Sequence, residues 1–225
     1  MSLRPRGNNL WKRHVELYTD IFRQALIVLS TLQEYGEKEI SISRQLNDLV
    51  QNACFDRGKE ITFPICEVPI ISKTENNTEN KSVDEWQMSG RPDFTCRLKN
   101  QYASSYSESE LDFHVECKCL GTPISSSWIY NRNYVNHGIM RFDQGDKRYG
   151  ENVSNGMMIG YILSMKPDDI CKEVNSELIE KRHNFEPICI SSRSSLYEAS
   201  QRLSRTIVLP SDFTLFHIWV VLQSK

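Results

Sequence analysis

Two short stretches of this chain hold the residue types that could do chemistry. The first is RPDF at residues 91–94, and the second is VECKC at residues 115–119. The second stretch places a glutamate and a lysine two residues apart in an otherwise apolar run. Because side chains alternate across a strand, Glu116 and Lys118 are expected on one face, with Cys117 and Cys119 on the other.

The simplest interpretation of this strand is structural. A half-buried strand of an antiparallel sheet turns its polar face to water. Here that face would carry Asp112, His114, Glu116 and Lys118. The glutamate and the lysine would then form a surface ion pair that contributes at most ~1 kcal/mol to stability.

Asp93 supports a second, chemical interpretation. It begins the preceding strand after the turn-forming residues 90–92, and hairpin pairing would bring it beside Glu116. Two carboxylates on one sheet face can bind a hard divalent cation, to which the backbone carbonyl of Cys117 could add a third oxygen. Lys118 would lie within reach of a metal-bound water or a phosphate oxygen. This set of groups suits metal-assisted hydrolysis of a phosphodiester.

The order Pro92-Asp93 followed by Glu116-Cys117-Lys118 resembles the motif of the PD-(D/E)xK nuclease superfamily, the restriction-endonuclease-like enzymes. The expected element order over residues 37–164 is similar as well: helix, strand, Asp strand, ExK strand, helix, strand. The resemblance implies Mg²⁺-dependent hydrolysis of DNA, with Mn²⁺ as a substitute ion and RNA still open as a substrate. It further implies an effector of a restriction or anti-phage defence system. The alternative is a catalytically silent module of the same fold that binds nucleic acid or a partner protein.

The resemblance also implies a further acidic residue on the helix before the first strand. Glu39 is preferred to Glu37 for this role, although a glutamate at a helix N-terminus is favourable without any catalytic role. Many relatives carry Gln-x-x-x-Tyr after the ExK strand. In this chain Arg148 stands four residues after Gln144 and Tyr149 five, so the spacing departs from that pattern.

Residues 130–149 combine basic, amide and aromatic side chains, which suit phosphate contact and base stacking. An ordinary solvated helix is the alternative. A second candidate for phosphate contact is the segment 191–205, where a surface helix is expected and Arg193, Arg202 and Arg205 could meet phosphates. The predicted nucleic-acid contacts in the first segment are Arg132, Arg141, Gln144, Lys147, Arg148 and Tyr149.

Apolar periodicity and turn residues predict the elements that position these groups. The expected fold is α/β, with a restriction-endonuclease-like core, a mixed sheet of four to five strands flanked by helices, and an extra N-terminal helix. Segments 1–36 and 37–225 are expected to form one structural domain. Helices are predicted at 9–35, 41–57, 168–183 and partly within 130–149, strands at 61–71, 93–98, 111–120, 156–164 and 214–222, and a polar loop at 72–90.

Composition limits the partners. A net charge of −2 over 225 residues argues against a protein that coats nucleic acid through bulk charge, though not against a local basic groove. Seven scattered cysteines without a signal-like segment are expected to be core residues of a cytoplasmic chain rather than a disulfide framework. DNA is the expected partner, with no membrane. A homodimer or a partner subunit of a defence complex stays open.

Overall fold

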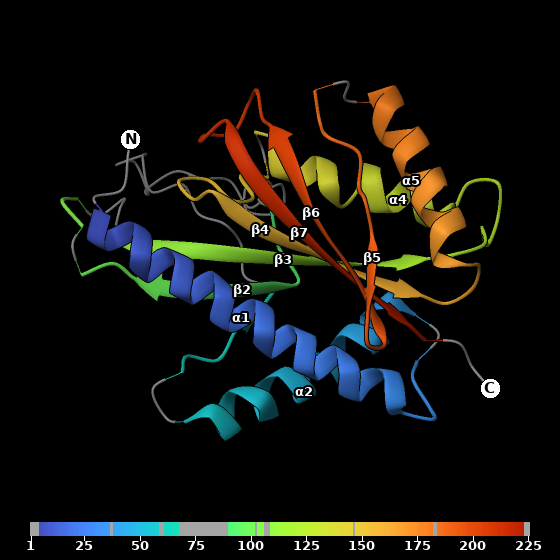
Figure 1. The fold of residues 1–225 in the computed structure, drawn as a ribbon, viewed down its shortest axis with the longest axis horizontal. Helices are drawn as coiled ribbons and strands as arrows, with labels where there is room; N and C mark the ends of the chain where they lie inside the picture. Colours follow the sequence, from blue (N-terminus) through green and yellow to red (C-terminus); the bar gives the residue numbers. More distant parts are fainter. Residues whose placement is uncertain are drawn as a thin grey trace, which may run out of the picture.

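In the computed structural model, residues 5–36, 38–58, 61–67, 90–101, 103–105, 109–145, 147–181 and 184–222 are described. Within these ranges the chain folds into one mixed seven-stranded sheet flanked by four α-helices (Figure 1). The predicted α/β class and mixed sheet are confirmed. The predicted strand number of four to five is wrong, because two further strands, at residues 191–193 and 196–204, extend the sheet.

The helices and strands follow the chain in an order close to the expected one. The two N-terminal helices are present with shifted ends. The helices are α1 (Pro5–Thr31), α2 (Glu39–Arg57), α4 (Tyr130–Asn136) and α5 (Pro167–Lys181), with a 3-10 helix η2 (Ile139–Asp143). The strands are β1 (Ile65–Cys66), β2 (Phe94–Lys99), β3 (Glu110–Leu120), β4 (Asn155–Ile162), β5 (Ser191–Arg193), β6 (Leu196–Ser204) and β7 (Asp212–Val221).

The strands lie in the order β1-β2-β3-β4-β7-β6-β5. The pairs β1–β2 and β2–β3 are antiparallel, and β4 then runs parallel to both β3 and β7. A parallel pair needs a crossover connection. Between β3 and β4 the chain therefore crosses one face of the sheet, where it forms α4 and η2.

The C-terminal hairpin is the main departure from the predicted elements. Residues 191–205 were expected to form a surface helix, but they form β5 and β6. Strand β6 pairs with β7 along its whole length, from Leu196 opposite Val220 to Ser204 opposite Asp212. A Ser- and Arg-rich segment has weak β-propensity by itself, so this long-range pairing decides its structure.

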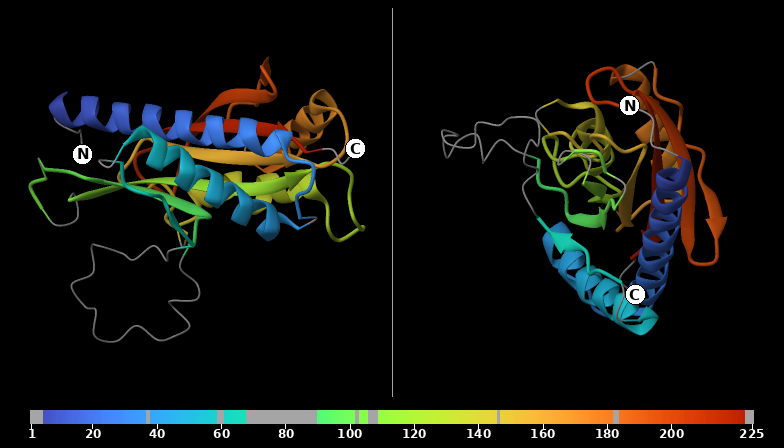
Figure 2. Two further views of the ribbon diagram at one scale, coloured as in Figure 1. Left: turned by 90° about the horizontal axis from the view of Figure 1, so that it is seen from below. Right: turned by 90° about the vertical axis from the view of Figure 1, so that its left-hand side faces the viewer.

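Two apolar layers hold the sheet. Helices α1 and α2 cover one face, and α4 and α5 cover the other (Figures 1 and 2). On β3, Val115 and Cys117 belong to the first layer, whereas Leu120 belongs to the second. Trp11 and Phe22 place the N-terminal helix in the same buried cluster as the sheet. Helix α1 is therefore part of the main core.

The strand at the edge of the sheet beside β2 is short. A strand was predicted over residues 61–71. Within its described part, residues 61–67, only Ile65 and Cys66 pair, opposite Thr95 and Phe94. Residues 68–89, including nearly all of the predicted 72–90 loop, lie outside the described part. All seven cysteines are free thiols. Cys54, Cys96, Cys117 and Cys119 are buried, as expected of core residues, whereas Cys171 is half-buried and Cys66 and Cys189 are exposed. No described helix has the length and apolar character needed to cross a membrane.

Candidate active site

The candidate site lies where β3 runs past the end of β2. Phe94, the first residue of β2, pairs with Val115, and β3 continues for five more residues that pair with β4 on the other side. From Glu116 onward, the backbone groups of β3 on the β2 side therefore have no partner strand among the described residues. Two carboxylates bind this free edge. The Cys117 N–H donates to Asp93 Oδ2 at 2.6 Å, and the Cys119 N–H donates to Glu39 Oε2 at 3.1 Å.

Lys118 occupies the centre of this edge. Its Nζ lies 2.7 Å from the Cys117 carbonyl oxygen, 2.9 Å from Glu39 Oε1 and 2.8 Å from Glu116 Oε1. Three oxygen atoms from two elements and the backbone thus surround one cation. The side chain reaches them because it stands on the same strand face as Glu116 and next to the free edge.

Glu116 receives further donors from the residues that cover this face of the sheet. Arg141 Nη1 lies 2.7 Å from Glu116 Oε1, and the Tyr149 hydroxyl donates to Glu116 Oε2 at 3.0 Å. Arg141 Nη1 also donates to the Tyr149 oxygen at 3.1 Å. The carboxylate is therefore held by Lys118, Arg141 and Tyr149 together.

The segment that carries Tyr149 packs closely against the turn before Asp93. A Cβ atom on Gly90 would clash with the carbonyl oxygen of Lys147 and with the Tyr149 ring. Only glycine permits this approach. The contact joins the turn before the first motif to the residues that hold Glu116, although the two segments are far apart in the sequence.

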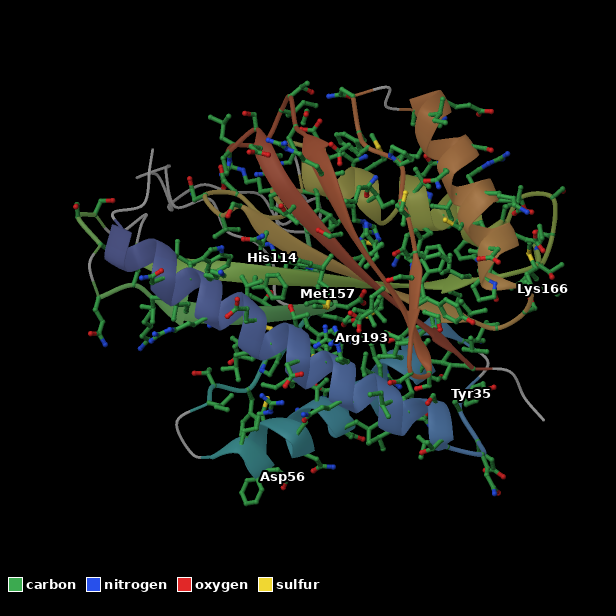
Figure 3. All side chains as sticks on the ribbon, in the orientation of Figure 1. Tyr35, Asp56, His114, Met157, Lys166 and Arg193 are labelled. Carbon is green, nitrogen blue, oxygen red and sulfur yellow. The ribbon has the colours of Figure 1, made fainter. Side chains whose placement is uncertain are left out.

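The polar face of β3 is buried, which corrects the expectation of a water-exposed face at three of its four positions. His114 is 3% exposed, Glu116 is 1% exposed and Lys118 is 9% exposed. Residues 139–150 cover this face, and the Gly150 N–H donates to His114 Nδ1 at 3.0 Å (His114 is labelled on β3 in Figure 3). The ion pair between Glu116 and Lys118 exists, but it is an interior pair. The contribution of this buried ion pair to stability therefore cannot be taken from values for surface ion pairs.

Burial and neighbouring charge shift the ionisation of this site. Burial, reinforced by the nearby Glu116 carboxylate, raises the pKa of Asp93 to about 8. Burial by itself lowers the pKa of Lys118, but Glu116, Asp93 and Glu39 outweigh it, and the net shift of the pKa is upward. Lys118 therefore stays an ammonium ion at neutral pH, whereas Asp93 is largely protonated there.

Oxygen ligands for a divalent cation are present in part. The Asp93 and Glu116 carboxylates and the Cys117 carbonyl are hard donors of the kind that Mg²⁺ prefers. Among the described residues, however, no three His, Cys, Asp or Glu side chains form a group that could hold a metal ion. The third ligand would have to be the backbone carbonyl, to which Lys118 now donates.

Glu39 reaches the site from the first turn of α2. It contacts both Lys118 and the Cys119 amide. Glu37, the alternative acidic residue, lies outside the described part. The spacing of four residues places Ser43 and Asn47 on the same helical stripe as Glu39. This polar stripe was readable in the sequence and was missed there.

The predicted nucleic-acid contacts separate into two groups. Arg141 and Tyr149 turn inward to Glu116, and the Tyr149 ring is fully buried, so no base can stack on it. Arg132 stands on α4 with its Nε 3.4 Å from Glu177. Arg148, in a left-handed conformation, lies 3.6 Å from Glu151. Gln144 and Lys147 lie half-buried in the turns after η2.

The arginines of the segment 191–205 are also divided. The Arg193 side chain is 69% exposed and approaches Glu198, and Arg202 pairs with Asp212. Arg205 is only 3% exposed, and its guanidinium donates to backbone carbonyls of residues 142, 149, 150, 153 and 210. Arg205 is a structural clamp and is not positioned to meet a phosphate.

Comparison with known proteins returned no match: no protein-family model, no curated protein and no solved structure matches this chain.

Proposed function

We propose that this protein is a Mg²⁺-dependent nuclease with a restriction-endonuclease-like core, which hydrolyses phosphodiester bonds of DNA. The observation that carries the proposal is the meeting of Asp93, Glu39 and Lys118 on the free edge of β3, where Asp93 and Lys118 contact the backbone of Cys117 and Glu39 contacts Lys118 and the Cys119 amide. These residues come from three separate elements. Glu116 stands directly beside them, in contact with Lys118.

The topology around the site supports the same proposal. Helix α2 precedes three antiparallel strands, and β4 returns parallel to β3 after α4. That is the order of elements that the resemblance implied for residues 37–164. Fold alone does not define an activity, so the proposed activity depends on the site. The role in restriction or phage defence rests on the resemblance only.

In the proposed reaction Asp93, Glu116 and the Cys117 carbonyl would hold the cation. A bound Mg²⁺ supplies an acidified water molecule and neutralises phosphate charge. Lys118, protonated at neutral pH, stabilises the charge on the phosphate in the transition state and does not act as a base. Glu39 keeps the ammonium group at the edge of β3. The proposed contacts to the phosphate backbone are Arg132, Gln144, Lys147 and Arg148, whereas Arg141 and Tyr149 position Glu116.

The replacement Lys118→Ala separates catalysis from binding. Both acidic ligands and the Cys117 carbonyl remain, so the variant is expected to bind Mg²⁺ and DNA. Its cleavage rate should fall by about 10²–10³, the usual effect of losing one electrostatic contact to a transition state. The measurement is cleavage of plasmid and linear DNA with Mg²⁺, Mn²⁺ or EDTA, alongside DNA affinity. Lys99→Ala, at an exposed position of β2, is the control.

Two outcomes would contradict the nuclease proposal. One is a folded Lys118→Ala protein that cuts as fast as the wild type. The other is a wild-type protein that binds DNA but cuts neither DNA nor RNA with either ion. The second outcome would favour the catalytically silent module. The observation that supports this module is the hydrogen bond from Lys118 to the Cys117 carbonyl, which occupies the proposed third metal ligand.

A further inference from the structure

A pocket of about 370 Å³ opens beside the candidate site, between α2 and the edge formed by β1 and β2. Glu39 and Asp93 form the end of the pocket that meets the free edge of β3. The remaining polar lining includes Arg44 and Asn47 from α2, together with Cys66 and Glu67. The pocket is therefore a route from solvent to the carboxylates that bind β3.

The charges of the lining are unbalanced. Three carboxylic acids, Glu39, Glu67 and Asp93, line the pocket with one basic residue, Arg44. Arg44 is exposed, and within the described part of the chain it makes no ion pair even with these neighbours. A guanidinium group without a counter-ion suits an incoming phosphate, which it can bind through two parallel hydrogen bonds.

The size of the pocket restricts what can enter. Its volume lies at the lower end of the range for sites that hold one small organic molecule. Glu116 and Lys118 lie behind it and are 1% and 9% exposed. A single nucleotide unit fits such a space, whereas an intact duplex cannot follow its backbone phosphate inward.

We propose that this pocket receives one single-stranded segment of nucleic acid, with Arg44 binding the phosphate next to the bond that is cleaved. The inference rests on the proposed nuclease function and adds to it the side of approach and the strandedness of the substrate. Because the acidic lining repels phosphate, the strand binds there only together with a divalent cation. Nucleic acid thus reaches the site from the α2 side of the free edge of β3.

Cys66 provides a direct probe of the pocket. It is exposed and lines the pocket, and Cys189 is exposed elsewhere on the chain and serves as an internal control. A thiol-specific reagent is applied with and without a single-stranded oligonucleotide in Ca²⁺, which supports binding without the need for cleavage. Labelling of each cysteine is followed by peptide mass spectrometry.

The oligonucleotide is expected to slow labelling of Cys66 several-fold in Ca²⁺ but not in EDTA, while Cys189 reacts at an unchanged rate. Arg44→Ala should require about tenfold more oligonucleotide for the same protection, because one charge-assisted contact is lost. The slope of the logarithm of the binding constant against the logarithm of the salt concentration should fall by about one, because one phosphate contact is lost. Arg13→Ala, an exposed arginine on α1, is the matched control and should behave as wild type.

Three results would overturn the inference. They are saturated binding without protection of Cys66, equal slowing at Cys189, and better protection by a blunt duplex than by the single strand. None of these measurements needs cleavage. The inference can therefore fail while Mg²⁺-dependent cleavage persists, and an absence of cleavage would count against the nuclease function whatever happens at Cys66.

Discussion

Asp93 combines two opposing properties. It accepts a hydrogen bond from the Cys117 amide, which favours the charged carboxylate, yet burial and Glu116 favour the neutral acid. The second influence is larger, since the pKa rises to about 8. In the isolated protein the residue therefore keeps a proton that a cation would have to displace. Such a raised pKa is typical of a functional site.

This ionisation predicts a pH dependence of stability in EDTA. The unfolded chain releases the Asp93 proton near pH ~4, whereas the folded chain holds it to about pH 8. Between these values the folded state binds more protons, so this contribution to stability is fully present below pH ~4 and is lost as pH rises to about 8. Asp93→Asn cannot ionise and should be more stable than wild type above pH ~8. Urea unfolding across this range measures the difference.

Asp56→Asn is the matched control for this variant. Asp56 is exposed at the far end of α2, away from the site (Figure 3), and its replacement should retain the wild-type pH dependence. A decline in the Asp93→Asn protein as steep as that of the wild type would contradict the assignment. The same variant should have lost Mg²⁺-dependent cleavage while it stays folded, because an amide is a weaker ligand than a carboxylate.

At the scale of elements, the segment from η2 to Tyr149 has one inner and one outer side. Arg141 and Tyr149 face β3 and hold Glu116, whereas Lys147 lies in the turn between them. Residues that looked equivalent as basic and aromatic side chains in the sequence therefore serve different purposes. The inner residues stabilise a buried carboxylate, and the outer residues remain candidates for phosphate contact.

Two matched replacements in this segment should give opposite results. Arg141→Met removes a donor from buried Glu116 and is expected to cost about 1–3 kcal/mol of unfolding free energy, with the salt dependence of DNA binding unchanged. Lys147→Met should change stability by less than about 0.5 kcal/mol but lower the salt slope by about one. Urea unfolding and binding titrations over a range of salt concentrations check both. If Arg141→Met lowers the salt dependence of DNA binding, Arg141 contacts a phosphate, contrary to this prediction.

Over the whole molecule, the C-terminal strands support the site from a distance. Arg205 follows β6 and binds five backbone carbonyls, most of them in residues 142–153. Asp143 complements this clamp, because its carboxylate accepts from the backbone N–H groups of residues 206, 207 and 208. The loop that carries Tyr149 is therefore fixed by a hairpin at the other end of the sequence.

Arg205→Met should show this dependence. Removal of the buried guanidinium leaves several carbonyls without donors and is expected to cost about 3 kcal/mol or more. Arg202→Met, at an exposed position of β6, should leave the unfolding midpoint close to wild type. Chemical unfolding measures both. Equal midpoints for the two variants would contradict the role of Arg205 as a clamp between the hairpin and residues 142–153.

Local patterns were sufficient for several features of this protein. Strand alternation separated Glu116 and Lys118 from Cys117, and the turn at residues 90–92 placed Asp93 at the start of the neighbouring strand. Helical periodicity predicted α2, with Glu39 in its first turn. These features depend on residues that are close together in the sequence, so the sequence is sufficient to predict them. They predicted the α/β class and the convergence of Asp93, Glu116 and Lys118 on one edge of the sheet.

Tertiary structure decided what covers each face and which strands pair. Alternation shows that Glu116 and Lys118 share a face, but only the packing of residues 139–150 shows that this face is buried. Pairing with β7 turned a segment expected as a helix into β6, and it moved Arg205 from surface to interior. Burial and strand pairing join residues that are distant in the sequence, and their free energies outweigh local propensity. For that reason local patterns could propose the chemical groups, whereas their ionisation and the pocket that leads to them depend on the complete fold.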